Sequence, residues 1–229
     1  KIIISKQYPY IRFILFGFRG SMMFGNLYQR SSCYYCHNTQ FTNKMSRYND
    51  GRLLCIDCVQ HIIVTTENLQ KVAVWVLQQI ENLGFKFKRG NTQVSLISQD
   101  KMQTLGFNGA EGLAINTTKT NIFSSTWHDQ AQIKVIYGMP TANLVWVLGH
   151  ELAHVLVSQH QYKFATQEKE EGFCQLVALL ISERSANPLM SRIIQKELKN
   201  RDPIYGEELR EAYQQYQKVG FQRYFQTFL

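Results

Sequence analysis

The sequence predicts an α+β protein in which a small zinc-finger module precedes a mainly helical domain with a small mixed sheet. Three observations lead to this prediction: two cysteine pairs near the N-terminus, alternating strand-like segments in the middle of the chain, and long helical segments after them. The 229 residues are 45% hydrophobic and 18% charged, so the chain can bury a core and is not disordered by composition.

We expect three regions along the chain: an N-terminal extension at 1–23, a four-cysteine zinc module at 24–62, and the larger domain at 63–229. The extension is expected to be disordered, and the protein cytoplasmic. Residues 1–21 combine basic residues with a short apolar stretch but lack a small-residue cleavage site, so export through this segment is the alternative. No apolar run reaches the roughly 20 residues of a membrane span, so we expect none.

The net charge of +8 is concentrated at the N-terminus. Seven basic residues and no acidic residue precede Asp50, whereas residues 50–229 hold 18 basic and 17 acidic residues. This asymmetry weakly favours an anionic partner at that end, either nucleic acid or another acidic surface. Because the body of the protein is nearly neutral, we do not expect nucleic acid as its partner, and we expect a protein partner at the zinc module.

The cysteine pairs have the spacing of a four-thiolate zinc site. Two C-x-x-C pairs are separated by 18 residues and comprise Cys33, Cys36, Cys55 and Cys58. A bound zinc ion would replace the hydrophobic core that so short a module cannot build, which predicts a structural site in a LIM-like or treble-clef-like finger. Two disulfides or free buried thiols are the alternative, and His37 and His61 are weaker alternate ligands.

The remaining elements follow from periodicity and turn residues. A helix is predicted over 66–83 and strands over 92–98, 111–123 and 131–137. Helices are then predicted over 142–158, about 168–184, about 188–200 and 206–218, with a short end piece after them. The helix at 142–158 is apolar nearly all round and should therefore be buried.

Within this buried helix the sequence reads His150-Glu151-Leu-Ala-His154. Two histidines four residues apart lie on one helix face and can share a metal ion, and Glu151 lies within reach of a metal-bound water. Ordinary histidines in this apolar setting would be buried polar groups without partners, which is costly. The motif therefore predicts a zinc site of the catalytic type, with Glu151 as general base.

Such a site needs a third protein ligand, and the stretch Glu168-Lys-Glu170-Glu171-Gly-Phe-Cys-Gln175 on the next helix offers three glutamates. Glu171 shares its helix face with Gln175, whereas Glu170 lies about 100° away around the helix. We therefore expect Glu171 to be the ligand, with Glu170 as the alternative and Glu168 as a first-turn acid facing the helix dipole. Gln175 is expected to bond a ligand histidine, and Cys174 to be a core residue.

These motifs, in this order, resemble a known family. An H-E-x-x-H motif followed by Glu-Gly-Phe on the next helix is similar to the gluzincin metallopeptidases. A closer resemblance is to the plant LIM-domain, ubiquitin-activated peptidases that limit organ size. The shared pieces are C-x-x-C-H and L-C-x-x-C at 33–37 and 54–58, an isoleucine followed by Tyr-Gly-x-Pro up to Pro140, the H-E-x-x-H motif, E-E-G-x-C-Q at 170–175, and P-x-Y-G at 203–206.

The resemblance covers roughly residues 30–225 and implies a zincin-like endopeptidase with His150, His154 and Glu171 as zinc ligands and Glu151 as base. The plant proteins also carry ubiquitin-interacting helices and a fuller LIM region. We recognise only one cysteine module and no such helix here, so we expect a minimal member without activation by ubiquitin.

The sequence leaves the oxyanion-stabilising donor open. Tyr205 is the candidate, since it lies in a turn before a helix; a packing role is the alternative, and His160 is a lesser candidate.

Three functions follow as hypotheses. The first is a zinc peptidase acting on protein or peptide substrates, which could pair with an edge strand such as 111–123. The second is an adaptor in which the finger binds protein and the metal helix is not catalytic. The third is hydrolysis of a non-peptide amide at the same centre.

Overall fold

The computed structural model describes residues 29–88, 92–120 and 127–228. The predicted N-terminal extension lies outside these ranges, as do the last three residues of the strand predicted over 111–123. No helix of the described residues is both long and apolar enough to cross a membrane.

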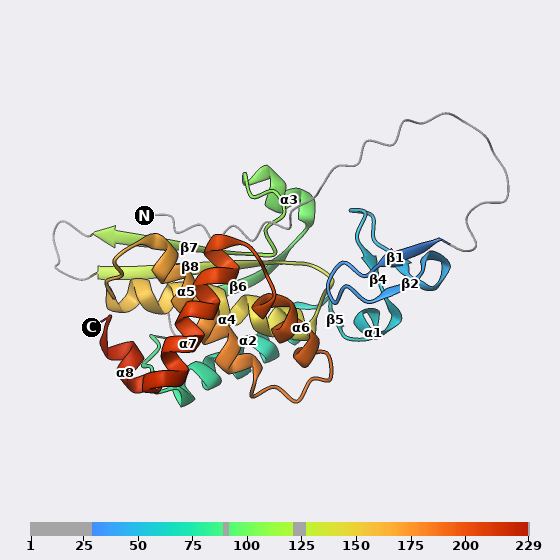
Figure 1. Cartoon of the computed structure of the whole chain (residues 1–229). Coiled ribbons are helices and arrows are strands. Elements are labelled where there is room, and N and C mark those ends of the chain that lie inside the picture. Colours follow the sequence, from blue (N-terminus) through green and yellow to red (C-terminus); the bar gives the residue numbers. More distant parts are fainter. Residues whose placement is uncertain (1–28, 89–91, 121–126, 229) are drawn as a thin grey trace.

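The N-terminal module consists of short strands and single helical turns around the four cysteines (Figure 1). Its elements are β1 (Arg30–Ser32), β2 (Thr39–Phe41), the 3₁₀ turn η1 (Thr42–Lys44), β3 (Ser46–Arg47), β4 (Leu53–Leu54), α1 (Ile56–Val59) and β5 (Ile62–Ile63). Two antiparallel pairs, β1–β2 and β3–β4, carry the cysteine turns. We call residues 29–63 the finger.

A three-stranded mixed sheet forms one face of the larger part, and a small mixed sheet was predicted. It contains β6 (Thr92–Ile97), β7 (Gly112–Thr120) and β8 (Trp127–Ile136). The order is β6-β8-β7, with β8 parallel to β6 and antiparallel to β7. Within the described residues β7 is therefore an edge strand. The short helix α3 (Gln99–Thr104) connects β6 to β7 and was not predicted.

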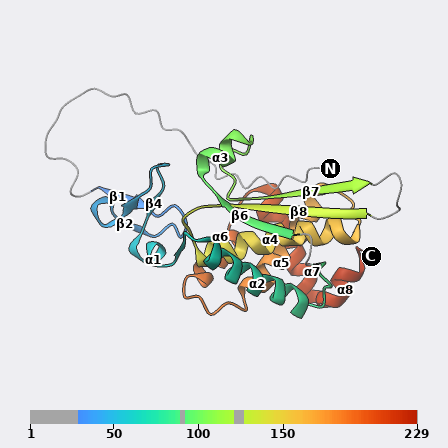
Figure 2. The same ribbon diagram turned by 180° about the vertical axis from the view of Figure 1, so that it is seen from behind.

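The helices pack in layers beneath this sheet (Figures 1 and 2). They are α2 (Thr66–Asn82), α4 (Thr141–His160), α5 (Gln167–Ser182), α6 (Met190–Leu198), the π-helical turn η3 (Pro203–Glu207), α7 (Glu208–Val219) and α8 (Phe221–Gln226). Helix α4 contacts the sheet on one side and α5 on the other, and α7 covers α5. The mixed helix-and-sheet architecture confirms the α+β prediction.

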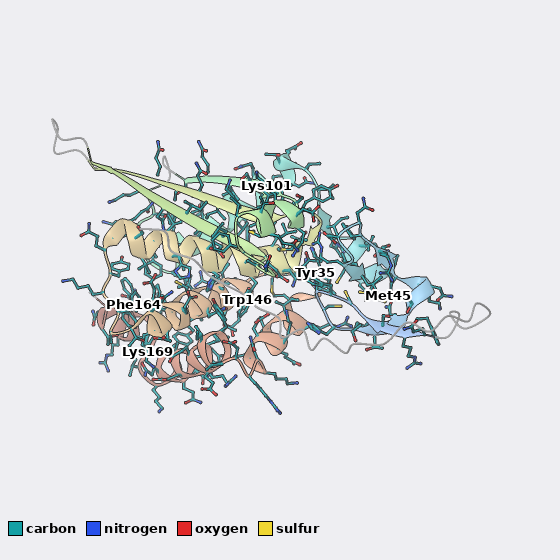
Figure 3. All side chains as sticks on the ribbon, turned by 90° about the horizontal axis from the view of Figure 1, so that it is seen from above. Tyr35, Met45, Lys101, Trp146, Phe164 and Lys169 are labelled. Carbon is teal, nitrogen blue, oxygen red and sulfur yellow. The ribbon has the colours of Figure 1, made fainter. Side chains whose placement is uncertain are left out.

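Close packing between α4 and α5 brings their facing side chains together. Gly149 of α4 is where they approach, since a Cβ there would lie 3.0 Å from the Cα of Ala178. Trp146, one turn before His150, is among the largest fully buried side chains and lies in this helical part (Figure 3). The buried residues form one cluster that runs from the finger, where Tyr35 is buried, into the helices.

The finger is joined to the start of α4 by several hydrogen bonds. Strand β5 pairs with β9 (Met139–Pro140), which directly precedes α4. The predicted domain boundary after residue 62 therefore falls inside β5, and the three predicted regions stay a prediction. The carbonyl of His61 accepts hydrogen bonds from both the backbone N and Oγ1 of Thr141, at 2.8 Å each. Because α4 has no side-chain N-cap, this carbonyl anchors its first turn.

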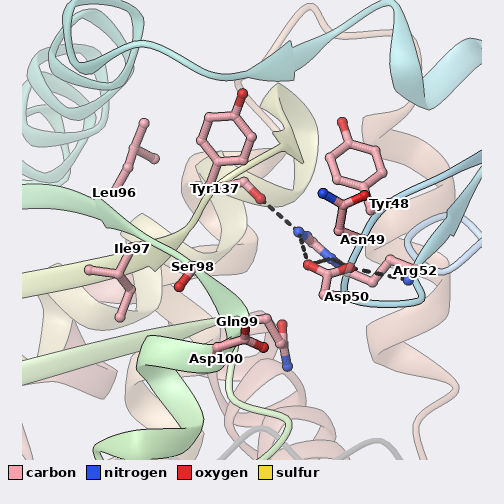
Figure 4. Close-up of a pocket in the computed structure, with 10 residues that line it drawn as sticks. All are labelled: Tyr48, Asn49, Asp50, Arg52, Leu96, Ile97, Ser98, Gln99, Asp100 and Tyr137. Atoms are coloured by element: carbon pink, nitrogen blue, oxygen red, sulfur yellow. Dashed lines mark hydrogen bonds and ion pairs between the residues drawn. The ribbon is translucent and has the colours of Figure 1, made fainter.

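Arg52 is the second connection, and it joins the finger to the segment that leads into α4 (Figure 4). Its Nη2 donates to the carbonyl of Tyr137 at 2.8 Å and to Asp50 Oδ2 at 2.7 Å, and its Nη1 donates to the hydroxyl of Tyr35. The Arg52 side chain is 4% exposed, so these bonds satisfy a buried cation. Burial tends to raise the pKa of Asp50, but the hydrogen bonds from Arg52 outweigh this and lower it.

Candidate metal sites

Helix α4 places three polar side chains in an apolar interior. His150 and His154 are 0% exposed and Glu151 is 2% exposed, and nearly every other residue of the helix is buried as well. Spacing of four residues puts both imidazoles on the face that meets α5. Groups this polar and this deeply buried need partners, which a metal ion would supply.

Glu171 of α5 completes a triangle with the two histidines. The Nε2 atoms of His150 and His154 are 3.2 Å apart, and Glu171 Oε2 lies 3.3 Å and 3.4 Å from them. Ligand atoms bound at about 2.0–2.1 Å in tetrahedral geometry lie about 3.3–3.4 Å from one another, so this triangle fits zinc. Two imidazoles and one carboxylate are also a donor set that leaves the fourth position open.

The ionisation of Glu171 suits this role. Burial tends to raise the pKa of its carboxyl group, but hydrogen bonds and charge interactions with His150 and His154 outweigh it and lower the pKa to about 2. The side chain is therefore a carboxylate at neutral pH, which is the form that binds metal. The sequence-based alternative, Glu170 as the ligand, does not fit the triangle.

Glu170 instead contacts the outer nitrogen of a histidine in the triangle. Its Oε1 lies 3.1 Å from Nδ1 of His154, whose Nε2 faces the triangle. A carboxylate there accepts a hydrogen bond from Nδ1–H, which favours the tautomer whose Nε2 is free to bind a metal ion. This role of Glu170 was not predicted from the sequence. Glu168 lies in the first turn of α5, as expected, beyond the Thr166 N-cap.

Of the two other α5 residues considered in the sequence, Cys174 is a core residue as expected, whereas Gln175 does not contact a histidine of the triangle. The expected bond from Gln175 to a ligand histidine is absent from the described structure: Gln175 Oε1 accepts from Trp146 Nε1 at 3.1 Å, and His150 Nδ1 has no protein partner. Trp146 lies one turn before His150 and Gln175 one turn after Glu171, so the two meet beside the triangle. Burial raises the pKa of Cys174 to about 12, which keeps it a neutral core thiol.

Glu151 faces the beginning of the edge strand β7. A Cβ added to Gly112 would lie 2.9 Å from Glu151 Oε1 and 2.5 Å from Cγ1 of Val147. A glycine is therefore needed where β7 passes over α4, and it brings the strand's backbone next to the carboxylate. This glycine was not singled out in the sequence.

Replacing Gly112 by alanine should displace the Glu151 side chain or the start of β7. We expect a destabilisation of about 1–3 kcal/mol, the usual cost of overpacking, together with a lower activity of any reaction that uses Glu151. Urea unfolding gives the first quantity. The control is Asn108→Ala, an exposed residue in the loop before β7. An unchanged stability of Gly112→Ala would contradict the close approach.

Tyr205 lies beside the triangle in the π-helical turn η3. Its ring centroid is 6.4 Å from that of His150, and the side chain is half-buried. Asp202 holds the turn in place, since its Oδ1 accepts from the backbone N atoms of Ile204 and Tyr205 at 2.9 Å each. His160 lies at the end of α4, and its Nε2 is 2.6 Å from the carbonyl of Lys86.

The four predicted cysteines also form one cluster. Cys33, Cys55 and Cys58 are buried, all four carry free thiols, and the Sγ atoms lie within 4.8 Å of one another. Sγ of Cys36 is 3.5 Å from that of Cys55, and the backbone N of Cys55 donates to Cys33 Sγ at 3.4 Å. Hydrogen bonds from Cys36 and Cys58 lower the pKa of Cys33, which favours its thiolate. His37 and His61 are not part of this cluster.

Fold and sites together define a mixed helix-and-sheet protein with two candidate metal centres, one of four thiolates and one of two imidazoles and a carboxylate. The family model described as DA1-like, Protein DA1, matches residues 91–197, a range that contains the whole triangle but none of the four cysteines. Protein DA1 of Arabidopsis thaliana is 21% identical across 62% of this chain. These matches support a relation to the DA1 family.

The chain spans about a third of the length of this curated relative, because the match covers 33% of it. No solved structure matches the chain.

Proposed function

We propose that the protein is a zinc-dependent endopeptidase of the gluzincin type that hydrolyses peptide bonds of protein substrates. His150, His154 and Glu171 would hold the zinc ion, and Glu151 would be the general base. The observation that carries the proposal is the burial of Glu151 in the same helical turn as the triangle and against the start of an edge strand. A purely structural metal site has no use for such a carboxylate.

A zinc ion bound to the triangle would supply a Lewis acid that lowers the pKa of a coordinated water and polarises the substrate carbonyl. Glu151 then accepts the proton of the attacking water and passes it to the leaving amine. Glu170 holds the His154 ring in the required tautomer through its contact with Nδ1. The half-buried hydroxyl-bearing ring of Tyr205, next to His150, is the proposed oxyanion donor.

The edge strand β7 offers a way to hold the substrate. An extended peptide that pairs with its outer edge would run past Gly112 and bring a carbonyl next to Glu151. In the finger, we propose that Cys33, Cys36, Cys55 and Cys58 hold a structural zinc ion in a LIM-like or treble-clef-like module. Four thiolates leave no open position, so this second ion would not be catalytic.

The test is zinc analysis of the purified chain together with cleavage of fluorescein-labelled casein. We expect two zinc ions per chain and cleavage that falls by about 10²–10⁴-fold in Glu151→Gln, the usual contribution of a general base. Glu168→Gln, which changes an acid in the first turn of α5, is the matched control and should cleave like the wild type.

Two outcomes would reject the peptidase. One is a single zinc ion that is unaffected by His150→Ala. The other is an equal rate of cleavage in the wild type and in Glu151→Gln when both sites are filled. Two bound zinc ions with no cleavage by any variant would favour the adaptor function.

A further inference from the structure

The finger carries a surface whose charge the metal sites do not explain. An open hollow of about 540 Å³ lies beside β2 and α1, and its lining comprises Arg30, Thr39, Gln40, Phe41, Lys44 and Ile56. Two of these residues are cations and none is acidic. Both cations belong to the N-terminal stretch that has no acid before Asp50.

Both cations are available to a partner. Among the described residues the side chains of Arg30 and Lys44 form no ion pair, and the Arg30 guanidinium lies 5.1 Å from the centroid of the Phe41 ring. Arg52 of the same finger differs, because Asp50, Tyr35 and Tyr137 occupy its donors in the hollow between the finger and β6 (Figure 4). Unlike Arg52, Arg30 and Lys44 therefore bring uncompensated positive charge to the β2 hollow.

The hollow also exposes apolar surface. Ile56, the first residue of α1, is 53% exposed, which is unusual for a large aliphatic side chain in a module this small. Phe41 is half-buried and flanks the same space. The chemical pattern is thus two cations around an aliphatic contact.

We propose that this hollow binds an acidic protein segment in which an apolar side chain lies between carboxylates. The apolar side chain would contact Ile56, and the carboxylates would pair with Arg30, whose guanidinium can bind a carboxylate through two N–H groups, and with Lys44. The proposal is independent of the peptidase function, since it involves none of the residues of the His/Glu triangle.

A protein segment fits this surface better than nucleic acid does. Nucleic-acid affinity comes from several phosphate contacts, and stacking of bases needs an open aromatic face. The hollow has only two cations, and Arg30 already covers the ring of Phe41. The exposed Ile56 side chain would make no favourable contact with a phosphate backbone.

The experiment measures fluorescence anisotropy of a labelled ten-residue peptide of glutamates with one central leucine, using the full zinc-loaded chain at low salt. We expect binding with a Kd below about 1 mM. Lys44→Glu should weaken it by about 5-fold or more, and Ile56→Ser by about 3–5-fold. Matched controls are Arg47→Glu, an exposed finger cation outside the hollow, and Val74→Ser, an aliphatic residue of α2 that is 57% exposed.

A peptide with glutamine in place of glutamate and a labelled oligothymidine of 20 nucleotides complete the design. The proposal is overturned if the acidic and the glutamine peptide bind equally, if Lys44→Glu and Arg47→Glu have the same effect, or if only the oligonucleotide binds. Zinc content and melting temperature show that each exposed variant is folded.

Discussion

Replacing Glu171 by glutamine is expected to empty the His/Glu site of zinc while the cysteine site keeps its metal. The carboxylate is the only anion of the triangle and lies 3.3 Å and 3.4 Å from the two Nε2 atoms. A neutral amide removes this charge and offers a poorer donor. Loss of a residue that only hydrogen-bonds a metal ligand lowers metal affinity by about 10–100-fold, and we expect a larger fall here because a ligand itself is replaced.

The neighbouring glutamates Glu170 and Glu168 provide controls in the same part of α5, with a smaller and with no expected loss of zinc affinity. Glu170→Gln should lower the zinc affinity by about 10–100-fold, because it removes only the acceptor for His154 Nδ1. Glu168→Gln should have no effect. Zinc per chain after dialysis against a competing chelator measures all three variants. If Glu170→Gln emptied the site and Glu171→Gln did not, our assignment of the third ligand would be wrong.

The gathering of the triangle could be predicted because it depends on short-range geometry. Four-residue spacing fixes the relation of His150 to His154, and the helix period separates Glu171 from Glu170. The roles of Glu170 and Gln175 could not be predicted, since they depend on how α5 is rotated against α4. Gln175 accepts a hydrogen bond from the indole of Trp146, and the position of Trp146 one turn before the motif does not reveal this contact.

The fold was predictable in its long elements and not in its short ones. Helix α4 is a long apolar segment that follows a Gly-x-Pro break, and the strands of the mixed sheet alternate, so the sequence displays both. The pair β5–β9 has two residues in each strand, and β9 contains Pro140, so neither carries a strand pattern. The contact of Gly112 with Glu151 depends on how the sheet crosses α4, which is a tertiary feature. These unpredicted features are the ones that connect the finger and β7 to the helix.

Loss of the finger metal is expected to loosen the start of α4 and to weaken the distant His/Glu site. In Cys58→Ser the finger loses one of the four clustered cysteine side chains, and small metal modules unfold without their ion. The amides of Gly138 and Thr141, which donate to the carbonyls of Ile63 and His61 at 3.0 Å and 2.8 Å, would lose their acceptors. We expect faster hydrogen exchange at both amides and a weaker zinc affinity at the triangle, by about 5–150-fold for a typical coupling.

A second variant separates this coupling from general unfolding. Arg52→Met keeps all four cysteines but removes the bond to the Tyr137 carbonyl and the cationic partner of Asp50, at a cost of about 2 kcal/mol or more. It should speed exchange at Gly138 with both zinc ions still bound. Amides in the middle of α5 serve as the internal reference, because α5 has no direct bond to the finger among the described residues. If Cys58→Ser left exchange at Thr141 and the affinity of the triangle unchanged, the finger would not anchor α4. Helix α4 begins at Thr141 and carries His150 and His154, so the bonds of its first turn to the finger link the cysteine cluster to the triangle.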